Sequence, residues 1–140
     1  MEDCFHNLGL RINGIIHLSP KEAWEAQQKG AVIVDVREEK EIEYKAFDVG
    51  NILFYPFSNF PAGFLSLPKD IPLIIAGGYG MRSKMVVEEL VKKGYSNVAN
   101  LNGGILEWER DGLPFKKQKG AEQNGPCPCQ LRPLRISDEK

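Results

Sequence analysis

The chain has 140 residues and a formal net charge of −1, and 42% of its residues are hydrophobic and 9% aromatic. This length suits one domain with a tail, and the apolar content is sufficient for a core, which argues against a wholly disordered chain. Charges of both signs are interspersed, so we expect no nucleic-acid partner. No segment approaches the roughly 20 apolar residues of a membrane span, so we expect no membrane partner either.

Cysteine usage and the N-terminus favour a cytoplasmic location. The chain has three cysteines, an odd number, and two of them lie near the C-terminal end, which does not suit a disulfide framework. The N-terminus starts M-E-D and lacks the apolar run of a signal peptide. A reducing cytosol fits these features best.

Strands and helices are predicted to alternate along the chain. In order, we predict a strand from 15–16, a helix that starts at 19–20 and stops at 30, a strand over 31–34, a helix over 38–44, a strand over 51–55, a loop over 57–68 with a helical turn near 60–65, a strand over 73–76, a helix that stops at 94, a strand over 97–101 and a helix from 103–104 to about 112. This alternation predicts an α/β fold with a central, mainly parallel β-sheet and helices on both faces. Trp24 and Trp108 lie on amphipathic patterns and are expected in the core.

The stretch 73–94 predicts a buried strand, a glycine-rich loop and an amphipathic helix in sequence. Glycines in the loop permit positive φ, so that successive N–H groups can point into one concavity. We expect the helix to begin near Arg82 or Ser83, with Ser83 as its N-cap. A strand, such a loop and a helix N-terminus predict an anion site or a site that activates a nucleophile. Its candidate residues are Gly77, Gly78, Tyr79, Gly80, Met81, Arg82 and Ser83.

Other interpretations of this stretch remain open. The glycines could simply form a tight turn, and the loop matches neither the dinucleotide fingerprint nor the P-loop, so phosphate or nucleotide binding depends on the helix terminus alone. Arg82 could contact an anion or pair with an acid such as Asp35 or Glu38, and we favour the pairing. Asp35 and Arg37 are expected to be turn and ion-pair residues.

Composition changes after residue 115. We predict an N-terminal segment over 1–14, a domain over 15–115 and a polar, flexible tail over 116–140 that contains several prolines.

Four stretches of this domain resemble the rhodanese-like family of single-domain sulfurtransferases. They are V-I-V-D-V-R-E-E at 32–39, the loop and helix at 77–94, G-Y-S-N-V-A-N-L-N-G-G-I-L-E-W at 94–108 and D-G-L-P at 111–114. The resemblance covers roughly residues 15 to 115. It implies a small α/β domain with a central parallel sheet, related to enzymes that transfer sulfur from thiosulfate or a persulfide.

The chain departs from this family where the chemistry is expected. Active members begin the loop with a cysteine, in a pattern like Cys-x-x-Gly-x-Arg-Ser, and Gly77 stands at the cysteine position here. The family mechanism needs that thiolate to accept sulfur as a persulfide, which glycine cannot do. A second departure is the segment Phe47-Asp48-Val49, where the family has Gly-His-Ile. The resemblance therefore implies a domain that lacks autonomous sulfurtransferase activity, has no catalytic residue of its own, and binds a small anion or an unknown protein partner. We expect no cofactor.

The tail offers a second hypothesis. Cys127 and Cys129, separated by one proline, could be incidental thiols, a sulfur-carrying or redox pair, or half of a soft-metal site shared with another chain. A lone Cys-x-Cys is a weak metal signal, and His6 and His17 are isolated, so we expect no metal. A flexible linker from Gly112 to Cys129 spans on the order of 20–25 Å, so the tail thiols could reach the loop.

Overall fold

The structure is a computed structural model that describes residues 5, 8–59, 67–79 and 81–117. Its strands are β1 Leu10–Ile12, β2 Ile15–Leu18, β3 Val32–Asp35, β4 Lys45–Phe47, β5 Ile52–Phe54, β6 Leu73–Ala76, β7 Val98–Leu101 and β8 Phe115–Lys117. Its helices are α1 Pro20–Gln28, α2 Glu39–Tyr44, α3 Met81–Lys92 and α4 Gly104–Arg110, with a 3-10 turn η1 at Phe57–Asn59. Within this described part of the chain, no helix has the length and apolar character needed to cross a membrane.

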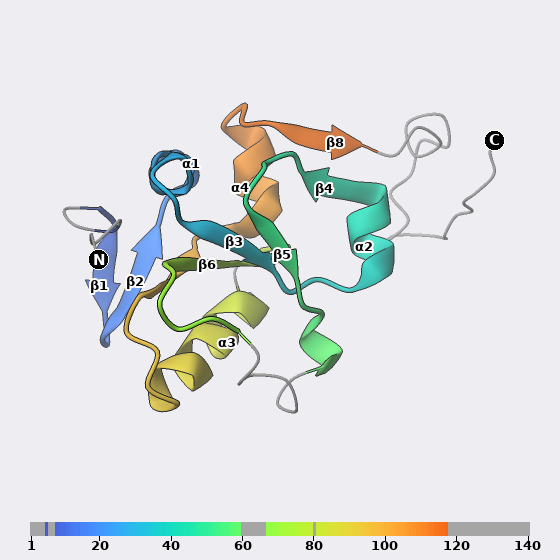
Figure 1. Ribbon diagram of the computed structural model, residues 1–140. Helices are drawn as coiled ribbons and strands as arrows, with labels where there is room; N and C mark the ends of the chain where they lie inside the picture. The colour runs from blue at the N-terminus through green and yellow to red at the C-terminus, as the bar shows by residue number, and fades with distance from the viewer. Residues whose placement is uncertain (1–4, 6–7, 60–66, 80, 118–140) are drawn as a thin grey trace.

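A six-stranded sheet in the order β1-β2-β7-β6-β3-β5 forms the centre of the molecule (Figure 1). The five strands from β2 to β5 in this order are parallel, and β1 is antiparallel to β2. All four residues of β6 and of β7 are buried, and β6 is entirely apolar, as is typical of parallel strands covered on both faces. The predicted α/β fold with a mainly parallel sheet is therefore confirmed.

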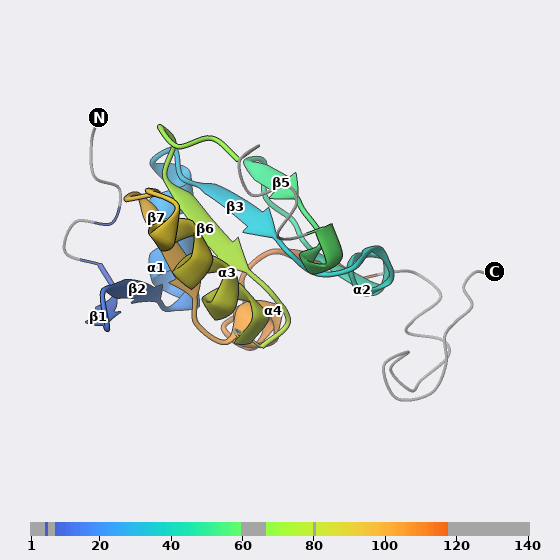
Figure 2. The same cartoon turned by 90° about the horizontal axis from the view of Figure 1, so that it is seen from below.

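Helices cover both faces of the sheet: α1 and α4 lie on one face and α3 on the other (Figures 1 and 2). Side chains alternate along β6 to serve the two layers. Ile74 and Ala76 join the core cluster on the side of α1 and α4. Leu73 and Ile75 join the cluster beneath α3. The central strand β6 is thus fixed from both sides, and so is the loop that follows it.

Two helix boundaries show how local sequence sets the elements. Ser19 caps α1, because its hydroxyl accepts the Glu22 N–H at 3.2 Å while the Glu22 carboxylate accepts the Ser19 N–H at 2.9 Å. α3 buries Val86 on the sheet and is followed by Gly94, whose φ of +98° is the left-handed conformation expected after a helix end. Both boundaries confirm the sequence predictions.

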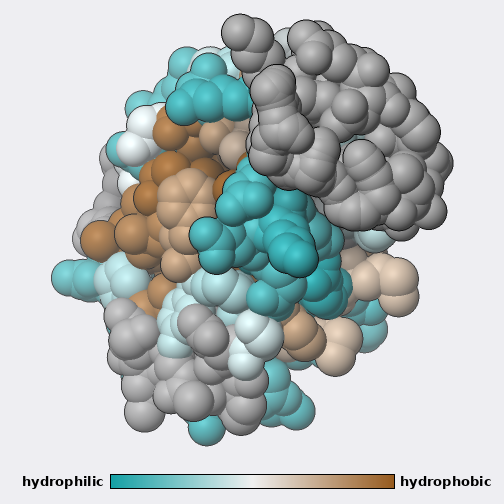
Figure 3. All heavy atoms as spheres, turned by 90° about the vertical axis from the view of Figure 1, so that its right-hand side faces the viewer, coloured by the Kyte–Doolittle hydropathy of each residue, from teal (hydrophilic) through white to brown (hydrophobic). Residues whose placement is uncertain are grey.

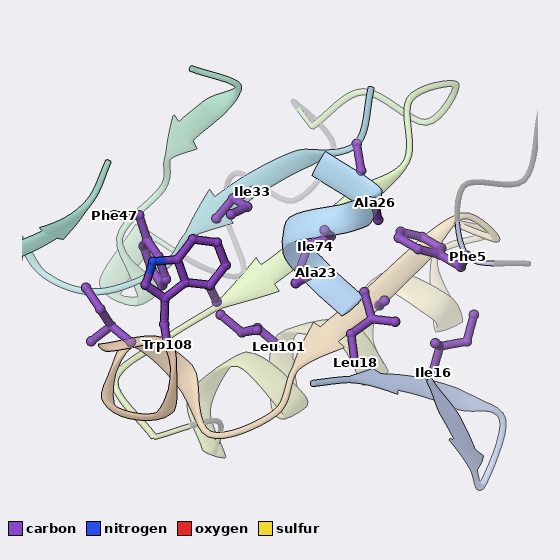
Figure 4. Packing of buried hydrophobic residues seen from close by; sticks show 14 residues of the cluster. Phe5, Ile16, Leu18, Ala23, Ala26, Ile33, Phe47, Ile74, Leu101 and Trp108 are labelled. Carbon is purple, nitrogen blue, oxygen red and sulfur yellow. The ribbon is translucent and has the colours of Figure 1, made fainter. Parts of the chain in front are cut away.

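The aromatic centre of the core is Trp108 on α4, which is fully buried (Figure 4). Its ring makes edge contacts with Phe47 at 5.2 Å and with Trp24 at 6.1 Å between centroids. The indole N–H donates to the carbonyl of Pro114 at 2.7 Å, so the buried polar atom is satisfied. The predicted core positions of both tryptophans are confirmed, although Trp24 is only partly buried.

Three short strands were not predicted: β1, β4 and β8. β4 and β8 form a separate antiparallel ribbon, with Lys45 opposite Lys117. The tail from 118 to 140, the helical turn predicted near 60–65 and Gly80 lie outside the described residues. The domain boundaries stay a prediction, and β1 and the end of β8 fall beyond the range 15–115.

Candidate functional site

The candidate loop follows the central strand of the sheet. β6 lies between β3 and β7, ends at Ala76, and is followed by Gly77, Gly78 and Tyr79 before α3 begins at Met81. The loop therefore lies at the carboxyl edge of a parallel sheet, where α/β proteins commonly bind ligands. Tyr79 and Met81 are 69% and 76% exposed, so apolar side chains flank the loop on the surface.

Gly77 has space for a side chain. A Cβ atom built there would lie 3.8 Å from the backbone nitrogen of Ser83 and 3.9 Å from both Cβ and Oγ of that residue, which are ordinary van der Waals distances. At Gly78 a Cβ would meet nothing within 4 Å. Neither glycine adopts positive φ, so the expectation of a left-handed loop at these two positions is wrong.

The left-handed glycines near the loop lie instead at the start of α4. Gly103 and Gly104 have φ values of +82° and +60°. A Cβ at Gly104 would lie only 2.4 Å from the carbonyl oxygen of Gly77. The N–H of Ile105 donates to that same carbonyl at 2.9 Å, and the next N–H donates to the Gly78 carbonyl at 3.2 Å. The start of α4 thus holds the loop backbone through a contact that only glycine permits.

Ser83 is not the N-cap of α3, because the helix already begins at Met81 and Ser83 is completely buried within it. Its hydroxyl donates instead to Oδ1 of Asn100 on β7, at 2.5 Å. Nδ2 of Asn100 contacts Nδ1 of His17 on β2 at 3.2 Å. Sequence reasoning missed Asn100 and His17 as neighbours of the loop. The alternation along β7 could have placed Asn100 on the α3 face, since it is two residues after the buried Val98.

His17 is partly buried beside α3. Its burial lowers the pKa of the imidazole below the ordinary value of 6.5, and the nearby positive charge of Lys84 lowers that pKa further. Glu88 acts in the opposite direction. His17 therefore favours its neutral form near pH 7.

Arg82 points toward α2. One terminal nitrogen of its guanidinium contacts both carboxylate oxygens of Glu41, at 3.1 and 2.9 Å. The predicted structural pairing is confirmed, but its partner is Glu41 and not Asp35 or Glu38. The two side chains are 33% and 43% exposed, so this contact is a solvated link between α2 and the start of α3.

Asp35 and Arg37 form a buried ion pair at the end of β3, as predicted. Nε and one terminal nitrogen of Arg37 donate to the two oxygens of Asp35 at 3.0 and 2.8 Å. The other terminal nitrogen donates to the carbonyls of Glu41 and Lys45, at 3.3 and 2.7 Å. The guanidinium also lies 5.5 Å from the ring centroid of Phe47. These contacts attach α2 and β4 to the sheet.

Residues 47–49 connect β4 with the end of the domain. Phe47 packs against Trp108, and the N–H of Asp48 donates to the carbonyl of Pro114 at 3.2 Å. The Asp48 carboxylate also pairs with Lys116 at 3.7 Å. Residues 47–49 therefore pack against α4 and connect β4 with the segment before β8.

The surface beside the loop is mixed. Figure 3 views the side of the molecule that carries α2, and hydrophilic side chains lie at the centre of this face with an apolar area beside them. On α3, Met85 is 53% exposed one turn after Met81. Exposed methionine and tyrosine are side chains that suit protein contacts.

Known proteins resemble this chain over the same region. The family model of the rhodanese-like domain matches residues 19–111. A thiosulfate sulfurtransferase, GlpE of Haemophilus influenzae (strain PittEE), is 36% identical over 102 residues, which cover 70% of this chain and 91% of the relative. A sulfurtransferase of Allochromatium vinosum is 33% identical over 95 residues, covering 68% and 87% of the two chains.

Solved structures agree with the fold. A rhodanese-related protein from Thermoplasma volcanium matches with a TM-score of 0.65 at 26% identity, over 71% of this chain and 96% of that one. A rhodanese-like domain protein from Staphylococcus aureus matches with a TM-score of 0.59 at 27% identity, over 72% and 98%. The family model matches more than half of the chain, and the relative from Haemophilus influenzae matches over nearly its whole length: the chain belongs to the rhodanese-like domain family.

Proposed function

We propose that this protein is a rhodanese-like binding module that does not transfer sulfur by its own loop. The observation that carries the proposal is Gly77, the residue at the position where active relatives have a cysteine. The chain contains no cysteine between residues 5 and 126, so no neighbouring residue within the domain can replace the missing thiol. Sulfur transfer through a covalent persulfide requires such a thiolate.

The ligand would be a small anion or an anionic group presented by a protein partner. The loop precedes the N-terminus of α3, a 12-residue helix whose first N–H groups favour negative charge. Arg82 is already held by Glu41, so it adds a donor only when an anion displaces that carboxylate. The exposed side chains of Tyr79 and Met81 would contact the partner around the anionic group.

Melting-temperature and chemical-shift measurements test this binding. We expect thiosulfate or phosphate to raise the melting temperature and to shift the backbone amides of residues 81–83. Arg82→Ala should change the affinity, whereas Arg110→Ala is a matched control, because Arg110 forms a similar exposed pair with Glu107 on α4. An anion site at the loop is contradicted if the amides of residues 81–83 do not shift with thiosulfate or phosphate at millimolar concentration and do not shift with nucleotides.

A second candidate function is a sulfur relay through the tail thiols. The favouring observation is where the tail leaves the fold: β8 ends at Lys117 opposite Lys45, which directly follows α2, and α2 contacts the loop through Glu41 and Arg82. Cys127 is the tenth residue after Lys117, which gives an extended reach of about 33 Å. This is sufficient for Cys127 to approach the loop.

In this relay, a tail thiolate would attack the outer sulfur of thiosulfate. The new S–S bond forms as the bond to the sulfonate sulfur breaks, and sulfite leaves with the electron pair, so a persulfide remains on the tail. Intact-mass spectrometry after incubation with thiosulfate should then show one or two additional sulfurs. They should vanish when Cys127 and Cys129 are both replaced by serine and persist in the control Cys4→Ser. Absence of any addition excludes the relay.

We also propose a cytoplasmic location. The support is the odd number of cysteines, which does not suit a disulfide framework and fits a reducing compartment.

A further inference from the structure

Three polar side chains connect the end of the loop with β2 at the α3 face of the sheet. Ser83 on α3 is completely buried, Asn100 on β7 is 2% exposed, and His17 on β2 is partly buried. The hydroxyl of Ser83 and Oδ1 of Asn100 are 2.5 Å apart, and Nδ2 of Asn100 and Nδ1 of His17 are 3.2 Å apart. The contacts therefore run from the end of the loop, across β7 to β2, and end at a titratable group.

The chemistry of the amide determines the direction of each hydrogen bond. Oδ1 only accepts, so the O–H of Ser83 donates to it. Nδ2 only donates, so Nδ1 of His17 must accept, and the neutral imidazole carries its proton on Nε2. With His17 neutral, the Ser83 proton is committed to Asn100.

Ser83 is also the nearest side chain to the space above Gly77. Its Oγ lies 3.9 Å from the position of a Cβ at Gly77. Because its proton points to Asn100, Oγ presents only lone pairs toward this space, and an anion there gains no hydrogen bond from the hydroxyl.

Protonation of His17 reverses this arrangement. An imidazolium has N–H groups on both nitrogens, so Nδ1–H would face the N–H groups of Nδ2. A half-turn of the Asn100 amide removes the conflict: Oδ1 then accepts from His17, and Nδ2 donates to Oγ of Ser83. The Ser83 O–H is released from Asn100 and becomes available to an acceptor in the loop.

We propose that Asn100 and His17 are positioning residues that set the direction of the Ser83 hydroxyl, so that protonation of His17 adds one hydrogen-bond donor to the loop. The inference deepens the proposed anion binding and rests on it for its functional consequence. It assigns the loop a stronger affinity for anions at mildly acidic pH than at neutral pH.

The charged groups around His17 determine the pH range in which its imidazole becomes protonated. From α3, Lys84 and Glu88 act on the imidazole; from β7 the neighbour is the uncharged Asn100, and from β1 the paired residue is the apolar Leu10. Burial and Lys84 together outweigh Glu88 and lower the pKa of His17, so the change is expected below pH 6.5.

The first experiment follows His17 itself by NMR in the protein without ligand. The imidazole ¹⁵N shifts should identify the Nε2–H tautomer at pH 7.5, and the side-chain amide of Asn100 should titrate together with His17. His6, the other histidine of the chain, is an internal reference. A neutral Nδ1–H tautomer, or an Asn100 amide that does not follow the titration, overturns the proposed control of the Ser83 hydroxyl by His17, whether or not the loop binds an anion.

The second experiment measures thiosulfate affinity between pH 7.5 and 5.5, where the charge of thiosulfate does not change. We expect about a tenfold gain in affinity toward pH 5.5, the contribution of one hydrogen bond to a charged group. The gain should disappear in both His17→Gln and Ser83→Ala. If the gain in affinity persists in Ser83→Ala, it is a charge effect of His17 alone, and this result would contradict a role of the Ser83 hydroxyl. Absence of thiosulfate binding at both pH values would contradict the proposed anion binding. The NMR experiment would still show whether His17 controls the direction of the Ser83 hydroxyl.

Discussion

Gly77→Cys tests whether the loop is ready for a nucleophile. The Cβ would meet Ser83 at 3.8–3.9 Å, and the residue has no left-handed φ, so the substitution needs no backbone change. We therefore expect a stability change within about 1 kcal/mol, or no more than about 5 °C in melting temperature.

The new thiol would lie beside the backbone nitrogen of Ser83, in the first turn of α3. A helix N-terminus lowers the pKa of a thiol from its usual value of about 8.5. A decrease of one to two pH units corresponds to about 1.4–2.7 kcal/mol in favour of the thiolate, and would raise the thiolate fraction at pH 7 from a few per cent to roughly a quarter or more.

The assay is the pH dependence of iodoacetamide alkylation, followed by thiosulfate-to-cyanide transfer, in a background where Cys4, Cys127 and Cys129 are serine. Gly50→Cys is the matched control, because that glycine is exposed, has ordinary φ and meets nothing within 4 Å. The control thiol should react with an ordinary pKa. Equal reactivity of the two thiols would show that the helix N-terminus does not activate a thiol at position 77, and a loss of several kcal/mol in Gly77→Cys would show that the loop does not accommodate the side chain.

Three further predictions concern the scaffold. Trp108→Ala should reduce the free energy of unfolding by about 3–5 kcal/mol in urea titration, because the ring is fully buried between two aromatic side chains; a loss below 1 kcal/mol would contradict its central position. Gly104→Ala should cost about 1–3 kcal/mol more than Gly112→Ala, since both have positive φ but only a Cβ at Gly104 collides with the loop backbone. Hydrogen bonds from the Ser19 and Gly9 N–H groups and the Ser19 hydroxyl lower the pKa of Glu22, so its contribution to stability is present above pH 4.5 and is lost as the pH falls through its folded-state pKa. The difference in melting temperature between the native protein and Glu22→Gln should therefore shrink in acid, and a constant difference would contradict this.

Much of the fold could be predicted because its central elements have strong local signals. The apolar run of β6 and the amphipathic pattern of α3 identify a strand and a helix without tertiary information. β1 and β8 are only three residues long and mostly exposed, which is too short a stretch for an apolar run or an alternation to identify a strand. They form because they pair with β2 and β4, and such pairing is not encoded in the local sequence.

The site was harder to predict than the fold, because its partners are distant in sequence. The position of the loop follows from the strand before it and the helix after it. The pairing of Arg82 with Glu41 joins residues 41 positions apart, and any nearby acid would have satisfied the sequence argument. Ser83 has the residue type of an N-cap, yet the helix begins two residues earlier and its hydroxyl bonds across to the sheet. Local residue preference could not reveal that tertiary contact.

The central claim is that this member of the rhodanese-like family does not transfer sulfur by its own loop. The most direct test is thiocyanate formation from thiosulfate and cyanide by the purified native chain, beside an active single-domain relative at equal concentration. We expect a rate equal to that of the reaction without protein. Turnover comparable to the active relative, retained when Cys4, Cys127 and Cys129 are replaced by serine, would contradict it.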